Sequence, residues 1–162
     1  MDLFEIYDFL QPNECSEIIG ICENKNEKPF ESIHCIKQHR VKFYDETIHA
    51  LIQNAIDQKF NSTSDSEYIL SQNFSYVRYE NGGYIAKHVD AYSEQNVKYT
   101  IIIYLNDNYE NGETFVVKND AEMDIDKKIG KAVIFEGSKI LHGSREVIGN
   151  KNVLLGKLIL IK

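Results

Sequence analysis

Apolar residues recur at helical spacing in two segments near the start of the chain, residues 12–23 and 46–60. The repeating positions are Cys15, Ile18, Ile19 and Cys22 in the first segment and Ile48, Leu51, Ile52, Ala55 and Ile56 in the second. A proline at position 12 suits the first turn of a helix. The pattern predicts two helices, with a strand over residues 3–10 before the first.

After residue 66 the period of the pattern changes to two. Runs of β-branched and aromatic residues are bounded by Gly, Asn and Asp, and they predict strands over residues 74–79, 99–105, 114–117, 131–135 and 153–161. Residues 24–29 and 61–66 are polar and are expected to be loops, while residues 33–44 have room for one or two short strands. The prediction is an α+β fold, mainly β: a double-stranded β-helix, or jelly roll, with the two N-terminal helices bracing one sheet from outside.

Two short glycine-containing segments punctuate the strands. The run Asn81-Gly82-Gly83 predicts a turn tolerant of positive φ between two strands, and Asn111-Gly112-Glu113 predicts another before residue 114. Both segments are expected to have structural roles.

Composition narrows the class of protein. The chain has 162 residues, 43% of them hydrophobic, which fits one domain over residues 1–162. Its net charge of −7 argues against a nucleic-acid binder, because phosphate contacts need a clustered positive surface. No signal-peptide pattern or stretch of membrane-spanning length is present, so a soluble cytoplasmic protein is expected. The three cysteines lack a CxxC pair and are expected to be reduced core thiols.

His88 and Asp90 are one residue apart, and His142 follows much later. In a strand, residues i and i+2 point to one face, so both side chains could reach one ion. Two imidazoles and one carboxylate are the facial ligand set of non-haem Fe(II) oxygenases, which leaves coordination positions open. An isolated H-x-D is a weak signal, and a surface pair at a loop edge is the alternative. His34, His39 and His49 lie outside this spacing and are not expected to be ligands.

Lys151 opens a predicted strand in which it shares one face with Val153 and Leu155. Burying an ammonium group costs several kcal/mol unless an anion meets it. The position therefore requires a protein carboxylate or an acidic ligand. The alternative is that Lys151 ends a hairpin turn and reaches solvent.

The second half of the chain resembles the Fe(II)- and 2-oxoglutarate-dependent dioxygenases of the prolyl 4-hydroxylase type. The resemblance rests on the order of five short pieces: residues 78–84 leading into His88-Val89-Asp90, residues 100–106, residues 111–115, His142, and residues 149–151. Residues 8–19 add a fainter match to the strand and helix that open these enzymes. Two positions depart from the family pattern. Gln11 replaces a Ser or Thr helix cap, and Gly156-Lys157 replaces a bulky aromatic.

The resemblance implies a role for each site residue. His88, Asp90 and His142 would bind Fe(II), and Lys151 and Tyr104 would hold the distal carboxylate of 2-oxoglutarate. Tyr79 matches another pocket tyrosine near the co-substrate. The implied reaction consumes O2 and 2-oxoglutarate, yields succinate and carbon dioxide and hydroxylates a substrate carbon, with ascorbate as an expected additive.

The leading prediction for the substrate is a proline in a protein or peptide. A free amino acid or another side chain is the first alternative, and a jelly-roll binding module without catalysis is the second. The tail of the chain lacks the RxNxTxR pattern of related nucleic-acid demethylases. The candidate substrate residues are Arg78, Tyr84, Tyr92 and Arg145, where Arg145 could instead pair with carboxylates. The polar segment 92–98 is a candidate lid.

Overall fold

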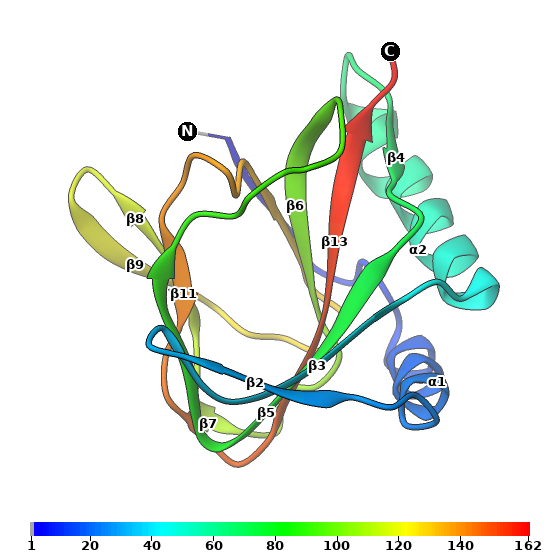
Figure 1. Ribbon diagram of the computed structural model, residues 1–162. Helices are drawn as coiled ribbons and strands as arrows, with labels where there is room; N and C mark the ends of the chain where they lie inside the picture. Colours follow the sequence, from blue (N-terminus) through cyan, green and yellow to red (C-terminus); the bar gives the residue numbers. More distant parts are fainter. Residues whose placement is uncertain (1) are drawn as a thin grey trace.

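The computed structural model describes residues 2–162 and is predominantly β (Figure 1). Its helices are α1 (Pro12–Cys22), α2 (Glu46–Lys59) and a 3₁₀ turn, η1 (Asn61–Thr63). Its strands are β1 (Leu3–Ile6), β2 (Lys28–Ser32), β3 (Cys35–Phe43), β4 (Tyr68–Leu70), β5 (Phe74–His88), β6 (Val97–Tyr104), β7 (Glu110–Asn111), β8 (Thr114–Lys118), β9 (Ala121–Ile125), β10 (Ala132–Phe135), β11 (His142–Ser144), β12 (Val147–Ile148) and β13 (Lys151–Leu160).

Among residues 2–162, eleven strands form one curled antiparallel sheet with β5 at its centre, and β7 pairs with β12 in a separate two-stranded sheet. The order β1-β10-β6-β13-β5 continues through β11 to β8 and β9. In addition, β3 pairs with β5, β2 pairs with β3, and β4 pairs with β13. The first part of β5 pairs with β13, and its last residues pair with β11. Because one strand belongs to both halves of the sheet, the sheet folds over on itself, as Figure 1 shows. The predicted jelly-roll fold is confirmed.

The segment Asn81-Gly82-Gly83 is a bulge inside β5, so the prediction that it separates two strands is wrong. In the pairing of β3 with β5, Ile36 lies opposite Tyr84 and Gln38 lies opposite Tyr79. Four residues of β5 therefore oppose one residue of β3. Gly82 has φ +87°, as expected. At Gly83 a Cβ would lie 2.7 Å from a backbone carbonyl oxygen, so only glycine fits there.

Both predicted helices are present on one face of the sheet (Figure 1). Asp45 caps α2 by accepting a hydrogen bond of 2.9 Å from the backbone N–H of residue 48. At the start of α1, the Glu14 carboxylate accepts a hydrogen bond of 2.8 Å from the backbone N–H of the N-cap residue Gln11, which is the reciprocal contact of a capping box. The helices bury their apolar stripes against the inner residues of the sheet in one continuous core.

The three cysteines are free and buried, as predicted. Burial raises the pKa of the Cys15 thiol to about 11 and that of Cys22 to about 12. Both thiols are therefore protonated near neutral pH and behave as small core residues.

Several strand boundaries differ from the predictions. The first strand ends at Ile6, because the chain then turns through Asp8 with φ +55°. Strand β2 begins at Lys28, inside a segment expected to be a loop. Strands β7, β11 and β12 are two or three residues long and too short to show alternation. Among residues 2–162, no helix is long and apolar enough to cross a membrane.

Candidate active site

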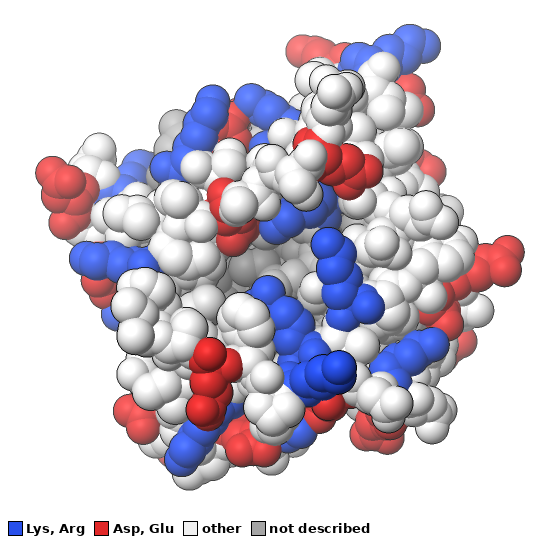
Figure 2. All heavy atoms as spheres, viewed as in Figure 1, with Lys and Arg blue, Asp and Glu red and all other residues white. Residues whose placement is uncertain are grey.

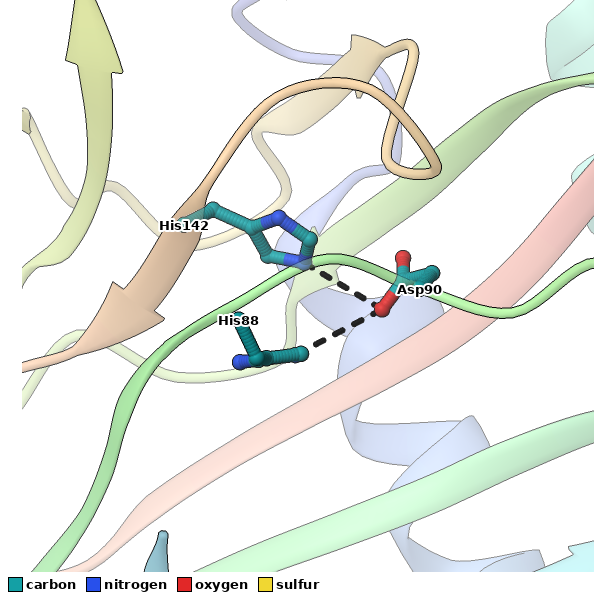
Figure 3. Close-up of side chains that lie close together, drawn as sticks. All are labelled: His88, Asp90 and His142. Atoms are coloured by element: carbon teal, nitrogen blue, oxygen red, sulfur yellow. Dashed lines mark ion pairs between the residues drawn. The ribbon is translucent and has the colours of Figure 1, made fainter.

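His88, Asp90 and His142 come together at the end of β5 and the start of β11 (Figure 3). His88 and His142 are directly paired across the two strands. The Nε2 atoms of His88 and His142 lie 3.4 and 3.3 Å from Oδ1 of Asp90, and the three ligand atoms lie within 4.8 Å of one another. Asp90 is beyond the end of β5, so strand alternation does not place it, although its side chain still reaches the pair.

Backbone carbonyls orient both imidazole rings. Nδ1 of His88 lies 3.0 Å from the carbonyl oxygen of Ala86, and Nδ1 of His142 lies 2.7 Å from that of Ile140. A carbonyl oxygen only accepts hydrogen bonds, so each Nδ1 carries the hydrogen that it donates. Each Nε2 faces the carboxylate of Asp90. A protonated ring donates a hydrogen bond from Nε2 to Asp90, and a neutral ring offers the Nε2 lone pair to a metal ion, as histidine ligands do.

The second oxygen of Asp90 is held by neighbours. Oδ2 accepts a hydrogen bond of 2.7 Å from Thr100 and lies 3.6 Å from Nζ of Lys157. Burial alone would raise the pKa of Asp90, but the hydrogen bonds from the two histidines outweigh it and hold the pKa well below its usual range. The hydrogen bond to Asp90 in turn raises the pKa of His88. The carboxylate is therefore ionised and fixed near neutral pH.

Gly137 is required beside this carboxylate. A Cβ at this position would lie 2.4 Å from Oδ2 of Asp90 and 2.3 Å from the hydroxyl oxygen of Thr100. Its carbonyl oxygen also accepts a hydrogen bond of 2.8 Å from the backbone N–H of Asp90. Gly137 lies in none of the segments that carry the family resemblance and is far from Asp90 along the chain. Thr100 begins the segment 100–106, but nothing in the sequence points to its contact with Asp90.

The donor atoms fit a metal cation. The two Nε2 atoms and the anionic oxygen of Asp90 face one another. Their electron pairs repel one another unless a proton or a cation lies between them. Two imidazole nitrogens and one carboxylate oxygen match the ligand preferences of Fe(II) in non-haem oxygenases. The three side chains could thus hold Fe(II).

Lys151 is the first residue of β13 and is 1% exposed. Its ammonium donates to the carbonyl oxygen of Gly112 at 2.8 Å, to Oγ of Ser144 at 2.9 Å and to Oγ1 of Thr114 at 3.3 Å. All three acceptors are neutral, and no carboxylate in residues 2–162 forms an ion pair with it. Burial lowers the pKa of Lys151 to about 7. The alternative that Lys151 reaches solvent is wrong, and an acidic ligand is the remaining way to compensate its charge.

Two tyrosines flank Lys151. Tyr79 is its direct partner across β5 and β13, and its ring centroid is 5.3 Å from the ammonium. Tyr104 lies on β6 with its centroid 5.7 Å from the ammonium. The hydroxyl of Tyr104 is buried without a hydrogen-bond partner, and so is that of Tyr109, which no sequence motif marks. An incoming acceptor such as a carboxylate would satisfy such a group.

One cavity of about 710 Å³ connects the three candidate ligands to Lys151. A volume of this size is typical of a small-molecule site. The residues that line it around the candidate metal and Lys151 include Tyr79, His88, Asp90, Thr100, Thr114, His142, Ser144 and Lys151. Tyr104 does not line this cavity, although it lies beside Lys151.

The candidate substrate residues have different locations. Tyr92 lines the cavity, and its hydroxyl is 2.7 Å from Oγ1 of Thr100. Arg78, Tyr84 and Arg145 do not line it. Arg78 forms ion pairs with Glu27 and Glu80.

Arg145 forms ion pairs with Glu122 and Asp124, which is the alternative to a substrate contact that was predicted for it. The remaining histidines lie outside the ligand cluster. His39 contacts Glu80 at 2.8 Å, and His49 contacts the carbonyl oxygen of residue 70 at 3.1 Å.

Comparisons with known proteins agree with this geometry. The family model of the 2OG-Fe(II) oxygenase superfamily matches residues 74–158, just over half of the chain. No curated protein sequence matches it.

Three solved structures share the fold at low sequence identity. A prolyl-4-hydroxylase from Pseudomonas putida is 14% identical with a TM-score of 0.75, over 99% of this chain and 93% of that one. A prolyl hydroxylase from Trichoplax adhaerens, in complex with a peptide fragment of the hypoxia inducible factor oxygen degradation domain, is 13% identical with a TM-score of 0.77, over 97% and 83%. HygX from Streptomyces hygroscopicus, with nickel, 2-oxoglutarate and hygromycin B bound, is 11% identical with a TM-score of 0.72, over 97% and 82%. From the family match, the chain belongs to the 2OG-Fe(II) oxygenase superfamily and is a 2-oxoglutarate- and Fe(II)-dependent dioxygenase.

Proposed function

We propose that this dioxygenase hydroxylates a proline residue in a protein or peptide. The observation that carries the dioxygenase chemistry of this proposal is one cavity that holds both a His-Asp-His cluster and a buried lysine without a carboxylate partner. The first feature suits Fe(II) and the second suits an anionic co-substrate, so together they match the two requirements of the family.

His88, Asp90 and His142 are the proposed Fe(II) ligands. The backbone carbonyls that hold each Nδ1–H, together with Thr100 on the carboxylate, fix the three ligand atoms before the ion arrives. When bound, Fe(II) activates O2 with 2-oxoglutarate as reductant, so that one oxygen atom enters succinate and the other enters a substrate C–H bond. Ascorbate is expected to keep the iron reduced between turnovers.

Lys151 is proposed to bind the distal carboxylate of 2-oxoglutarate. Its ammonium would exchange a neutral environment for an anionic one, which relieves the cost of its burial. Tyr104 would donate its unpartnered hydroxyl to the same group, and Tyr79 lines the wall beside it. Because Lys151 is itself held by three oxygens, the co-substrate would be oriented before the reaction begins.

The segment 92–98 is proposed to act as a lid. Residues 91–94 and Val97 line the cavity, so this segment forms part of its wall. Its polar contacts include Tyr92 with Thr100 at 2.7 Å and Glu94 with Ser71 at 2.5 Å. At its end, inside β6, Lys98 forms an ion pair with Glu136 at 2.5 Å. Closure over a substrate would exclude water from the reacting groups.

A peptidyl proline is the leading substrate, supported by the shared fold with two prolyl hydroxylases, one of them bound to a peptide. A free amino acid, another side chain or another small molecule is the second candidate. It is favoured by the equally extensive likeness to HygX, whose structure contains hygromycin B.

Succinate formation from 2-oxoglutarate, measured with Fe(II), ascorbate and proline-containing peptides, tests the proposal together with the mass of each peptide. We expect peptide-stimulated succinate and a gain of one oxygen atom on proline, both lost in His142→Ala. Substitution of His49, which lies outside the cluster, by alanine is the control. Stimulation by a free amino acid, with no oxygen gained by any peptide, would favour the second candidate.

A further inference from the structure

The wall of the cavity carries a second set of cations besides Lys151. Arg40 and Lys42 are two residues apart on β3, and both line the cavity. Lys157 lies six residues after Lys151 on β13, so strand alternation places both lysines on the same face. The register joins these positions, because Lys42 pairs with Ser75 of β5 and Ser75 pairs with Leu155 of β13. Three cations therefore share one face of the sheet, and we call Arg40, Lys42 and Lys157 the basic wall.

The basic wall is poorly neutralised within the protein. Among residues 2–162, neither Arg40 nor Lys42 forms an ion pair with a carboxylate. Nη2 of Arg40 donates to Gln38 at 3.1 Å, its guanidinium lies 4.8 Å from the ring centroid of Phe30, and its Nε is buried without a hydrogen-bond partner. A buried donor without a partner is costly unless a ligand satisfies it.

Lys157 connects the basic wall to the proposed metal centre. Its Nζ lies 3.6 Å from Oδ2 of Asp90 and 5.2 Å from the ring centroid of Tyr92. An anion bound here would lie beside the groups that hold the metal.

The charges of the bound co-substrate leave the basic wall uncompensated. Fe(II), Asp90, Lys151 and doubly negative 2-oxoglutarate together carry no net charge. The other charged residues that line the cavity are Arg40, Lys42, Lys157 and Glu94. The substrate side is therefore net positive, although the whole chain carries −7. Figure 2 shows Lys and Arg side chains gathered around the central hollow of this face.

We propose that the substrate carries a carboxylate close to the carbon that is hydroxylated, and that the basic wall binds it. This inference rests on the proposed function and narrows its substrate class. In a peptide, the carboxylate would belong to an Asp or Glu next to the target proline. The α-carboxylate of a free amino acid offers the same chemistry, so the test has to separate the two sources.

The test measures binding and chemistry separately. Fluorescent Gly-Glu-Pro-Glu-Gly and Gly-Gln-Pro-Gln-Gly peptides are titrated with the protein loaded with Zn(II) and 2-oxoglutarate, and free proline and a single-stranded oligonucleotide compete. We expect the Glu peptide to bind about tenfold more tightly than the Gln peptide, with a preference that weakens as salt is added. Arg40→Gln and Lys42→Gln should each reduce that preference about twofold. Lys28→Gln is the matched control, since Lys28 pairs with Arg40 from β2 but does not line the cavity.

Each outcome decides one part of the inference. Equal binding of the Glu and Gln peptides, no binding of either, or tighter binding of the oligonucleotide would overturn it. A weaker affinity for 2-oxoglutarate in Arg40→Gln, with peptide preference unchanged, would also overturn it by assigning the wall to the co-substrate. Effective competition by free proline would identify the α-carboxylate as the source.

The oxygen content of the peptides under turnover then separates the two proposals. An acidic peptide that binds but gains no oxygen contradicts the prolyl-hydroxylase proposal and leaves the basic wall supported. Equal hydroxylation of the Glu and Gln peptides supports the prolyl-hydroxylase proposal and contradicts the role of the basic wall.

Discussion

Two fully buried lysines, Lys131 and Lys151, have opposite surroundings in this protein. Lys131 is 0% exposed and donates to the carboxylate of Glu5 at 2.8 Å, to the carbonyl oxygen of Asp126 at 2.6 Å and to the hydroxyl of Tyr7 at 3.2 Å. Lys151 is 1% exposed and has only neutral acceptors. The first charge is compensated by the protein, and the second is not.

The difference separates a structural site from a binding site. A lysine with its own carboxylate contributes to stability and has no need of a ligand. A buried lysine without a carboxylate lowers the free energy of unfolding until an anion binds to it. The ligand-free protein is therefore less stable than it would be with a compensated charge, and anion binding restores that stability. The residue type alone does not distinguish the two cases, because both lysines begin or precede apolar strands.

Replacing Lys151 with methionine should produce the largest effect. The affinity for 2-oxoglutarate is expected to fall at least about thirtyfold, because losing a buried charge partner costs roughly 2–5 kcal/mol. The free energy of unfolding without ligand should stay the same or rise, since methionine fills the space without a charge. Calorimetric titration and urea denaturation measure the two quantities. A strongly destabilised Lys151→Met protein would contradict the assignment.

A substitution that places a carboxylate beside Lys151 should compensate its charge within the protein, as Glu5 does for Lys131. Thr114→Asp places an anion where a hydroxyl oxygen now lies 3.3 Å from the ammonium. The KM for 2-oxoglutarate should rise about tenfold or more as the internal carboxylate competes for the charge. Thr114→Asn has the same shape without the charge and should change the KM far less. Equal effects of the two substitutions would point to shape and not to charge.

The stability of the ligand-free protein should depend on pH through Lys151. Its folded pKa, about 7, is below the unfolded value of 10.5, so between these values the unfolded state binds more protons. Stability should therefore increase with pH in this window, with a contribution of about 1.4 kcal/mol per pH unit from this group. Urea denaturation from pH 7 to 10 measures the slope in the wild type and in Lys151→Met. An identical slope in both proteins would show that Lys151 does not titrate in this way.

Removing the carboxylate of Lys131 should have the smallest of these effects. Glu5→Gln is expected to lower the free energy of unfolding by about 1 kcal/mol, because the Glu5 side chain is 39% exposed and its charge is partly screened. Activity should be unchanged in the surviving folded protein. Denaturation with urea and succinate formation, measured side by side, check both statements. A loss of turnover without a loss of stability would contradict the purely structural role of Lys131.

The parts of the fold that sequence predicts are those with a repeated period. Two amphipathic helices and the longer strands show one, whereas β11 and β12 are too short for it. The bulge at Gly82 inside β5 depends on its partner strand β3, which is distant in sequence. Local residue types indicate flexibility there but not whether the chain turns back or continues.

Some residues of the site can be predicted from the sequence and others cannot. His88, Asp90, His142 and Lys151 can, because their chemistry is unusual at their positions. Thr100 and Gly137 cannot, since their importance arises only from contact with the carboxylate in the folded chain. Arg145 shows the reverse case. It is close to His142 in sequence, but its side chain pairs with carboxylates of β9.

If the carboxylate of 2-oxoglutarate compensates the charge of Lys151, then binding of 2-oxoglutarate is accompanied by proton uptake, which can be measured directly. The measurement is calorimetric titration of 2-oxoglutarate into the Zn(II)-loaded protein at pH 8, in two buffers of different ionisation enthalpy. With a pKa of about 7, most Lys151 is neutral at this pH before binding, so close to one proton should be taken up with each ligand. Tight binding without proton uptake, or equally tight binding to Lys151→Met, would contradict the account.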